Sequence, residues 1–372
     1  MKKVVIIGCG FAGLSTVSQL SQLNDLIEIT VIDRNENFHF RPLLPDVVSG
    51  TVNSRDILYP ILNFRQKYGF KYICDTVTDV DFTSKQVILK SARIPYDFLV
   101  IATGSETPFP KADSFKHLAL KLDTAYDADR ITDAVRSAAY HNIIICGAGY
   151  TGSETASQIW KLIRKERLQK NVMIVEMLDK ILSTMPKWIQ DYSTESFNQM
   201  GVPVLLNTKV EDVDHSRVSL SNGRVIDNSL LIWATGLRPP ELIKNLKVNK
   251  DNQGRIITEK DLRFTEDCYA AGDSGCFKKN GECLRMSVQF SIQQGICVAE
   301  NIHRQISGNS TVSFKEKDPG LILPMSNGRS AGTVFDFRVT GWKATILHYA
   351  ASIYYVKGIF KKAGIASNLI LN

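Results

Sequence analysis

The chain has 372 residues and a mass of 41.6 kDa, with 44% hydrophobic and 22% charged residues. This balance is typical of a folded protein of two or three domains, and it excludes intrinsic disorder, a collagen-like repeat and a disulfide-stapled miniprotein. The formal net charge is only +7. Such an excess, without a clustered basic stripe, argues against a nucleic-acid partner.

The cysteines and the N-terminus indicate a reducing compartment. None of the seven cysteines belongs to a CxxC or CxxxxC pair or lies near a His at zinc-ligand spacing, so we expect reduced thiols and no metal site. Only four apolar residues follow the N-terminal Met-Lys-Lys, too few for a secretory signal. No apolar run approaches the length of a membrane-spanning helix. We therefore expect a cytoplasmic protein.

The first predicted unit covers residues 2–33 and reads strand, glycine turn, helix, strand. Residues 4–7 are β-branched throughout, which is typical of a parallel strand buried on both faces. A GxGxxG turn follows, with Gly8, Gly10 and Gly13, and a helical pattern extends to about residue 23. The second strand ends at Asp33, 20 residues after Gly13.

The same unit recurs in the middle of the chain. Residues 142–146 form a predicted strand, followed by a second GxGxxG turn with Gly147, Gly149 and Gly152 and a helix to about residue 168. The next strand ends at Glu176, 24 residues after Gly152. A strand before the glycines, a helix after them and an acid about 20 residues later are the context that distinguishes a dinucleotide site from a simple tight turn.

Each element of this unit has a role in holding a dinucleotide. The glycines permit the sharp turn, the approach of the backbone to a pyrophosphate and the close packing of helix on strand, while the acid accepts hydrogen bonds from ribose hydroxyls. Two units predict two dinucleotides, or one dinucleotide and a duplicated relic. We expect FAD at the first and a nicotinamide at the second, because a Gly272-Asp273 strand end is suited to hold the rest of the flavin. Glu176, with no Arg after it, favours NADH over NADPH.

Two further strand ends complete the predicted architecture. Residues 96–104 and 229–236 both end in Ala-Thr-Gly, and each follows a small β insertion, near residues 87–89 and 218–225. The expected fold is α/β, with two Rossmann-like dinucleotide-binding domains. We expect the FAD-binding domain at residues 1–106 and 255–325, the NADH-binding domain at 107–254, and a C-terminal region at 326–372.

These motifs, in this order, resemble the two-dinucleotide flavoproteins of disulfide-reductase fold. The segments NFHFRPLLP at 37–45 and VQFSIQQG at 288–295 are more specifically similar to type II NADH:quinone oxidoreductases, whose A-Q-x-x-x-Q-x-G helix faces the flavin at the quinone site. Val288 here replaces the usual alanine. The resemblance implies a non-electrogenic respiratory-chain flavoenzyme, in which NADH gives a hydride to the flavin N5 and two electrons then pass to a membrane quinone.

The resemblance also assigns residues. Glu154, Gln289 and Gln293 are the candidate catalytic residues. The FAD contacts are expected at Gly8, Gly10, Gly13, Asp33, Arg34, Thr103, Gly104, Gly272, Asp273 and Gln289. The NADH contacts are expected at Gly147, Gly149, Gly152, Glu154, Glu176 and Gly236. The alternatives for these residues are a polar helix face for the glutamines and a first-turn glutamate favoured by the helix dipole for Glu154.

The C-terminal residues have a pattern of their own. Trp342, Ile346, Tyr349, Ile353, Val356 and Phe360 form an amphipathic stripe at helical spacing, and the residues from 337 onward include five basic and no acidic side chains. This pattern suits an interfacial helix of a monotopic protein attached to the cytoplasmic face of a membrane. The alternative is a helix packed on its own domain or on a second subunit. We also expect the protein to form a homodimer.

Three other functions remain open on the sequence, one of them a soluble ferredoxin-type reductase. A sulfide:quinone oxidoreductase shares the fold but needs a cysteine pair at the flavin, and Cys276 and Cys283 bracket only a short loop. An NADH-sensing flavoprotein, similar to apoptosis-inducing flavoproteins, would turn over slowly and change its partner affinity instead. The six histidines are scattered and form no predicted metal or nucleophile constellation.

Overall fold

The computed structural model describes residues 1–23 and 26–355, which divide into two compact units. The first unit contains residues 1–38, 59–106 and 237–318, and the second contains residues 39–58, 107–236 and the chain from 319 onward. These boundaries differ from the predicted ones, because residues 237–254 lie in the first unit and residues 39–58 and 319–325 lie in the second.

Residues 39–58 lie in the second unit because of how their apolar side chains pack. Helix α2 (Leu44–Val48) is buried along its whole length and contacts α5 (Ala125–Arg136) and α6 (Tyr150–Lys165), which belong to that unit. The hydrophobic sequence Leu-Leu-Pro-Asp-Val-Val thus finds its core far along the chain, which local patterning does not reveal.

The first unit is built on a six-stranded sheet in the order β19-β20-β9-β1-β2-β5. All neighbouring strands are parallel except β19, which is antiparallel at one edge. The sheet strands are β1 (Lys2–Ile7), β2 (Ile27–Asp33), β5 (Lys71–Cys74), β9 (Phe98–Ile101), β19 (Arg263–Thr265) and β20 (Cys268–Ala270). The buried residues of β1 and β9 are all apolar, as expected for central parallel strands covered on both faces.

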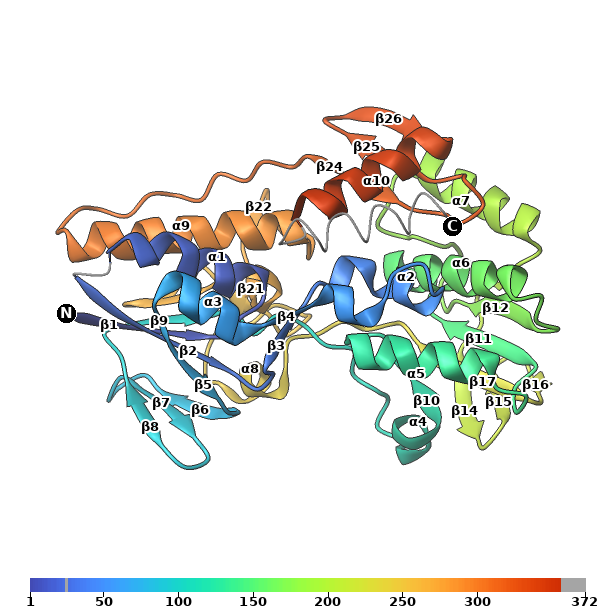
Figure 1. Cartoon of the computed structure of the whole chain (residues 1–372), viewed down its shortest axis with the longest axis horizontal. Helices are drawn as coiled ribbons and strands as arrows, with labels where there is room; N and C mark the ends of the chain where they lie inside the picture. The colour runs from blue at the N-terminus through green and yellow to red at the C-terminus, as the bar shows by residue number, and fades with distance from the viewer. Residues whose placement is uncertain (24–25, 356–372) are drawn as a thin grey trace. The chain divides into compact units, whose positions relative to one another are not determined.

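One face of this sheet is covered by helices and the other by a β insertion. Helices α1 (Phe11–Leu20) and α9 (Val288–Ile306) lie side by side (Figure 1). The apolar cluster on the other face includes β6 (Val77–Asp81), β7 (Gln86–Leu89), β8 (Arg93–Pro95) and α8 (Glu241–Asn245). The other elements of this unit are η1 (Ser21–Leu23), α3 (Ile61–Tyr68), β18 (Ile256–Ile257), η4 (Gly272–Ser274), β21 (Gly275–Cys276), β22 (Lys278–Lys279) and β23 (Glu282–Cys283).

The second unit repeats this plan around a five-stranded parallel sheet in the order β10-β17-β11-β12-β13. Its strands are β10 (Ala119–Leu120), β11 (Asn142–Cys146), β12 (Asn171–Val175), β13 (Val204–Leu205) and β17 (Ser229–Trp233). The predicted insertion forms β14 (Val210–Asp214), β15 (Arg217–Leu220) and β16 (Val225–Ile226). The remaining elements are η2 (Arg41–Leu43), η3 (Ser54–Ile57), α4 (Asp113–Leu118) and α7 (Lys187–Met200), while β3 (Asn37–His39) and β4 (Leu58–Pro60) lie where the chain passes between units.

The C-terminal part of the second unit is a three-stranded antiparallel sheet followed by one helix. The strands are β24 (Gly320–Leu323), β25 (Ala331–Val334) and β26 (Phe337–Thr340), and the helix is α10 (Gly341–Tyr355). Of the predicted amphipathic stripe, Trp342 and Ile346 are 65% and 56% exposed, whereas Tyr349 points inward. Val356 and Phe360 lie outside the described residues. Among the helices of residues 1–23 and 26–355, none is long and apolar enough to cross a membrane.

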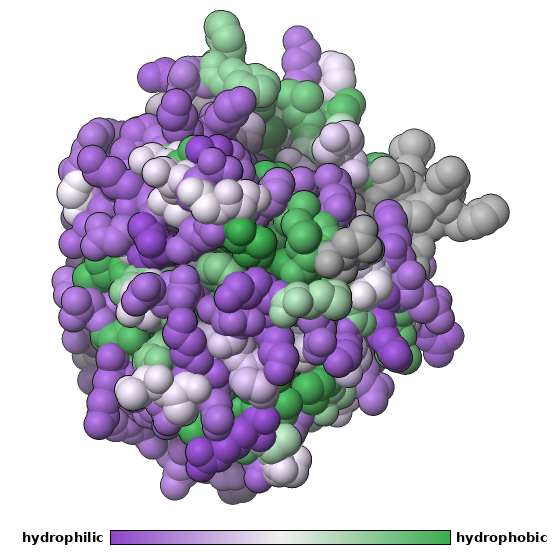
Figure 2. Space-filling model, turned by 90° about the vertical axis from the view of Figure 1, so that its left-hand side faces the viewer, coloured by the Kyte–Doolittle hydropathy of each residue, from purple (hydrophilic) through white to green (hydrophobic). Residues whose placement is uncertain are grey.

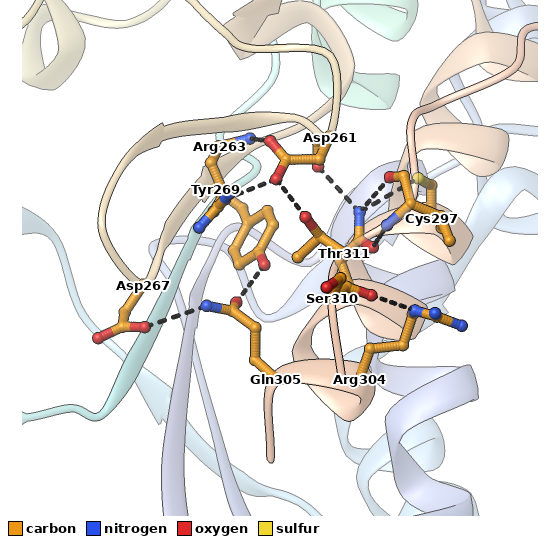
Figure 3. Close-up of polar contacts among 11 residues, drawn as sticks. Asp261, Arg263, Asp267, Tyr269, Cys297, Arg304, Gln305, Ser310 and Thr311 are labelled. Atoms are coloured by element: carbon orange, nitrogen blue, oxygen red, sulfur yellow. Dashed lines mark hydrogen bonds and ion pairs between the residues drawn. The ribbon is translucent and has the colours of Figure 1, made fainter. Parts of the chain in front are cut away.

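A polar network holds the extended segment that follows α9 (Figure 3). The Asn301 side chain donates to the carbonyls of Asp261 and Val312, and its carbonyl oxygen accepts from the Val312 N–H. Thr311 donates to Asp261 at 2.8 Å, and Arg263 donates to the same carboxylate. Because these polar groups satisfy one another inside the unit, the segment stays on the surface of α9.

The structure corrects the expectation that the cysteines are reduced. Cys276 and Cys283 form a disulfide, with a Cα–Cα distance of 5.2 Å. The reason is the β22–β23 hairpin, in which Cys283 pairs with Lys278, so that the chain returns toward Cys276 just before the hairpin. The other five cysteines are free, and Cys9, Cys146, Cys268 and Cys297 are buried.

The side of the molecule in Figure 2 is mostly hydrophilic, with hydrophobic residues in separate patches.

Candidate functional site

The first glycine turn connects β1 to α1. At Gly8, φ is +100°, and an added Cβ would lie 2.3 Å from the carbonyl oxygen of Ala102. At Gly13, a Cβ would lie 2.0 Å from the Gly8 oxygen. Only Gly10 has open space before it, because no atom lies within 4 Å of its ideal Cβ position. The first and third glycines are thus needed for the turn itself, and the second leaves a cradle in which a phosphate fits.

The second turn, between β11 and α6, has the same construction. At Gly147, φ is +105°, and an added Cβ would lie 3.0 Å from the carbonyl oxygen of Ala234. At Gly152, an added Cβ would lie 1.9 Å from the Gly147 oxygen. Gly149 again faces open space within 4 Å. In both units the turn lies against an Ala-Thr-Gly strand end, whose last residues, Gly104 and Gly236, have φ of +71° and +79°.

The two acids brace the turns through the same backbone contacts. Asp33 accepts a hydrogen bond from the Cys9 N–H at 2.7 Å, and Glu176 accepts one from the Ala148 N–H at 2.6 Å. The other carboxylate oxygen of Glu176 accepts from the Leu178 N–H at 2.9 Å. Each carboxylate oxygen has two lone pairs, so both acids retain capacity to accept from ribose hydroxyls.

The helices that leave the turns have no side-chain cap. Gly10 and Gly149 are the N-caps of α1 and α6, and neither helix has an acidic residue in its first turn. By contrast, α5 carries a capping box formed by Thr124 and Asp127, and Ser287 caps α9. Because the first N–H groups of a helix need acceptors, the two glycine-turn helices provide donors and a positive dipole end for an anionic ligand.

A third loop of the first unit gathers the other predicted FAD contacts. The Gly272 N–H donates to Gln294 at 2.7 Å, and Asp273 accepts from Ser105 at 2.7 Å. Ser274 accepts from the Gly104 N–H at 2.9 Å and shares a hydrogen bond with Thr103. The structure therefore brings together Thr103, Gly104, Gly272 and Asp273, which are far apart in the sequence.

Helix α9 reaches the glycine turn through its own glycine. An added Cβ at Gly295 would lie 2.3 Å from the Ala12 oxygen, and the Gly295 carbonyl accepts a hydrogen bond from Thr16 at 3.1 Å. This close packing fixes the position of Gln294, which holds Gly272. Gln294 was not among the predicted site residues, although its place directly before a helix-packing glycine is a usable signal.

The two predicted glutamines of α9 have different surroundings. Gln293 is engaged with the backbone of Lys317: its amide donates to the Lys317 carbonyl at 2.7 Å and its oxygen accepts from the Lys317 N–H at 2.8 Å. Gln289, one turn earlier, is half-buried. Arg34, another predicted FAD contact, forms an ion pair with Glu106 at 2.9 Å.

Glu154 lies inside the second unit, in the part of α6 next to the glycine turn. Its side chain is buried, and this burial, followed by the nearby Asp46 carboxylate, raises its pKa well above the ordinary value. His348 of α10 lies beside it. Asp46 was not among the predicted site residues, and the proximity of His348 to Glu154 was not predicted. An acid within the apolar run of residues 43–48 was a signal for Asp46, but nothing local connects His348 to α6.

The comparisons with known proteins agree with this architecture. The family model for pyridine nucleotide-disulphide oxidoreductases matches residues 2–295. A type II NADH:quinone oxidoreductase of Staphylococcus aureus (strain MSSA476) is 27% identical, with 98% of this chain and 96% of the relative covered.

Two solved structures share the fold. An NDH2 from Plasmodium falciparum in complex with NADH aligns with a TM-score of 0.87 at 20% identity, covering 99% of this chain and 97% of the other. The sulfide:quinone oxidoreductase of Aquifex aeolicus aligns with a TM-score of 0.83 at 19% identity, covering 98% and 92%. With its paired glycine turns and the family match over most of its length, the chain belongs to the pyridine nucleotide-disulphide oxidoreductase family.

Proposed function

We propose that this protein is an FAD-dependent NADH:quinone oxidoreductase of the type II class. The observation that carries the proposal is the pair of glycine turns, each with one open glycine, one bracing acid and an uncapped helix. If the second unit no longer bound a dinucleotide, neither the open space beside Gly149 nor the Glu176 carboxylate at the turn would be needed. The name of the Staphylococcus aureus relative, aligned over nearly the whole length of both chains, supports the same activity.

We assign FAD to the first unit and NADH to the second. In the first unit, the loop with Gly272 and Asp273 lies against Thr103 and Gly104 and offers more polar groups than a turn alone. In the second, Glu176 is followed by Met177 and Leu178, both exposed and neither basic. A carboxylate at this place repels a 2′-phosphate, so NADH is the expected donor and NADPH is not.

The chain's own residues position and orient the reactants. A bound FAD would supply the capacity to take up a hydride and to release two electrons to an acceptor. The glycine turns would hold the pyrophosphates and the acids would hold the riboses, while Gln294 fixes the Gly272 loop. Gln289 is our first candidate for the quinone, with Gln293 holding the neighbouring segment through Lys317. No covalent nucleophile and no proton pump is required.

We propose peripheral attachment to the cytoplasmic face of the membrane through α10. Trp342 and Ile346 are exposed on this helix, and Lys343 is exposed beside them. Exposed Trp and aliphatic side chains with basic neighbours are typical of helices that lie in the headgroup region. Co-sedimentation with anionic lipid vesicles tests this: a Trp342→Ser/Ile346→Ser double variant should lose binding. A dimer that survives in the absence of lipid and dissociates in this variant would instead place α10 at a subunit interface.

A Glu176→Ala variant tests the nicotinamide assignment. It should raise the KM for NADH and reduce the preference for NADH over NADPH, because one ribose acceptor and one repulsive charge are removed. Glu166→Ala is a suitable control, since Glu166 pairs with Arg136 on the surface of the same unit. An unchanged KM for NADH in Glu176→Ala would refute the assignment of NADH to the second unit.

A second candidate, sulfide:quinone oxidoreduction, is favoured by one observation, the Cys276–Cys283 disulfide that follows the Gly272 loop. A cysteine pair in this unit could exchange with sulfide. Sulfide-driven quinone reduction that disappears in both Cys276→Ser and Cys283→Ser would support this candidate. If both variants retain activity with NADH, the disulfide has a structural role only.

A further inference from the structure

A disulfide, a carboxylate and a guanidinium group lie together in the first unit. Cys276 ends β21 and Cys283 ends β23, and their sulfurs are bonded to each other. The Asp251 Oδ2 atom lies 3.4 Å from the Cys283 sulfur and accepts from the Arg255 Nε atom at 2.8 Å. The ligand atoms of Asp251 and the two cysteines lie within 4.8 Å of one another, but the adjacent Arg255 charge opposes a metal ion there. The cluster is therefore better suited to thiol chemistry.

The two cysteines differ in their access to solvent. Cys276 is 0% exposed, whereas Cys283 is partly exposed. Cys276 is also held in place by β18, because Ile257 is its strand partner and its carbonyl oxygen accepts from the Thr258 N–H at 3.2 Å. Disulfide exchange begins with the attack of a thiolate on an accessible sulfur. A reductant therefore reaches the bond at Cys283, and Cys276 is the leaving sulfur.

The disulfide is the covalent anchor of a short hairpin. Strands β22 and β23 have two residues each and pair antiparallel with each other. The Leu284 N–H adds one hydrogen bond, to the Phe277 carbonyl at 3.0 Å. A hairpin of this size is marginally stable without further support. Opening the disulfide should therefore increase the fraction of molecules in which the hairpin is detached.

The hairpin in turn holds the extended segment that follows α9, residues 309–318. The Phe277 and Phe314 rings meet edge to face, with centroids 5.1 Å apart. Lys279 of β22 forms an ion pair with Glu316. Both contacts depend on the position of the hairpin, so a detached hairpin releases the middle of this segment.

The same segment is bonded to the part of α9 that carries the predicted acceptor residues. Gln293 holds the backbone of Lys317 through two hydrogen bonds, at 2.7 and 2.8 Å. Gln289 lies one turn before Gln293 on the helix. Lys317 directly follows Glu316, which the hairpin holds. A continuous series of contacts within the first unit therefore connects the disulfide with this end of α9.

We propose that Cys276 and Cys283 form an exchange site for a dithiol, and that its redox state sets how firmly the hairpin holds the 309–318 segment on α9. The effect on the acceptor rests on the proposed function, because it acts through Gln293 and its neighbour Gln289. The role of the bond is structural: it lies outside the electron path from flavin to acceptor, and the dithiol opens and closes it.

The dithiol alone balances the exchange. One of its thiolates bonds to the Cys283 sulfur, the Cys276–Cys283 bond breaks, and Cys276 leaves as a thiolate that takes up a proton. The second thiolate then attacks the reductant sulfur of this mixed disulfide, so the reductant leaves as a disulfide and Cys283 is released and protonated. Two electrons and two protons have passed from the dithiol to the pair. The Cys283 thiol then has a hydrogen-bond acceptor in place, the Asp251 Oδ2 atom.

The position of Cys276 explains why the reductant needs two thiols. Strand pairing with β18 keeps the Cys276 thiolate close to the mixed disulfide. It therefore attacks the Cys283 sulfur again at a high effective concentration and expels a reductant that has only one thiol. A second thiol in the same reductant competes with this return.

The exchange can be followed chemically in the complete holoenzyme, purified without reductant. Trapping with N-ethylmaleimide and peptide mapping should find Cys276 and Cys283 joined, then free after dithiothreitol, and joined again after diamide. Glutathione at the same thiol concentration should leave most of the bond closed. Cys74→Ser removes the exposed free cysteine and is the control, which should behave as the wild type. A bond that dithiothreitol does not open in the folded protein, or that glutathione opens equally well, would overturn the proposal.

Hydrogen exchange measures the structural effect. Reduction removes the closure of a seven-residue loop, so peptides covering residues 277–287 and 309–318 should exchange about thirty-fold faster with dithiothreitol. The Cys276→Ser/Cys283→Ser variant should exchange at the faster rate with or without dithiothreitol. Equal exchange of the oxidised and reduced wild-type protein would overturn the proposal, and this comparison decides the matter even if the variant does not fold.

The acceptor reaction provides the functional readout. After anaerobic removal of dithiothreitol, the reduced protein should have a KM for a short-chain quinone about five-fold higher, the equivalent of one lost hydrogen bond. The rate of bleaching by NADH should stay within about two-fold. An unchanged KM would refute the effect on the acceptor. Failure of the wild-type protein to bleach with NADH would instead refute the proposed function, whereas the hydrogen-exchange result needs neither substrate and tests the cysteine pair by itself.

Discussion

The open glycines provide a substitution that separates binding from folding. At Gly10 and Gly149, φ is −76° and −72°, both accessible to alanine, and no atom lies within 4 Å of an added Cβ. An alanine at either position therefore fits the protein but occupies the space that a pyrophosphate requires. At Gly13 and Gly152 the same methyl group would lie 2.0 and 1.9 Å from a backbone oxygen, so these alanine variants serve as clash controls.

The expected magnitudes differ widely between folding and binding. Alanine is a poorer N-cap than glycine but has less conformational entropy in the unfolded chain, and these effects leave the free energy of unfolding within about 1 kcal/mol. A methyl group that displaces the phosphates disturbs at least two hydrogen bonds to a charged group, each worth about 1.5–3 kcal/mol. A loss of about 3 kcal/mol is a hundred-fold weaker dissociation constant, at about 1.4 kcal/mol per factor of ten.

The assay compares flavin content, NADH affinity and thermal stability in the same preparations. Gly149→Ala should purify with its flavin and a near-normal melting temperature, yet bind NADH about a hundred-fold more weakly. Gly10→Ala should purify without flavin, and its second unit should still be folded. Normal NADH affinity in Gly149→Ala, or loss of flavin rather than NADH binding, would refute the assignment of the second turn. Gly13→Ala and Gly152→Ala should both unfold at much lower temperature.

Three further predictions follow from single contacts. Gln289→Ala should raise the KM for quinone without changing the melting temperature. Gln293→Ala should also destabilise the protein by about 2 kcal/mol, because two hydrogen bonds to Lys317 are lost. Identical melting temperatures of the two variants would contradict this distinction. Cys283→Ser should lower stability by about 2 kcal/mol, the entropic value of closing a loop of seven residues, and an unchanged urea midpoint would mean that the disulfide is absent in solution. Burial raises the pKa of Asp46 from 3.8 to about 6, so this carboxyl group keeps its proton to higher pH in the folded state than in the unfolded state. Its protonation therefore stabilises the fold. This contribution, up to about 3 kcal/mol, is lost as the pH rises from about 4 through 6. Asp46→Asn should lack this pH dependence in chemical denaturation, and parallel curves for the two proteins would exclude it.

The dinucleotide turns could be predicted because their signals are local. Each turn, helix and bracing acid lies within about 35 residues, and the glycines are required by contacts with neighbours in the same unit. The Ala-Thr-Gly strand ends and the β insertions were also recognisable, since buried strands and hairpin turns have clear patterns.

The remaining features depend on contacts between distant residues. His348 and Glu154 are 194 positions apart, and nothing near either residue indicates the other. Residues 39–58 carry an apolar pattern that any core could bury, so their place in the second unit was not predictable. The Cys276–Cys283 disulfide was missed because cysteine spacing alone does not reveal a hairpin between two cysteines.

The most direct test of the proposed activity is stopped-flow absorbance of the purified protein, mixed anaerobically with NADH and then with a short-chain quinone. Our account predicts rapid bleaching of the oxidised-flavin band near ~450 nm by NADH and rapid recovery on addition of quinone. Bleaching without recovery would exclude quinone as the acceptor. No bleaching by NADH would mean that the second glycine turn does not hold a working nicotinamide, and would contradict the account.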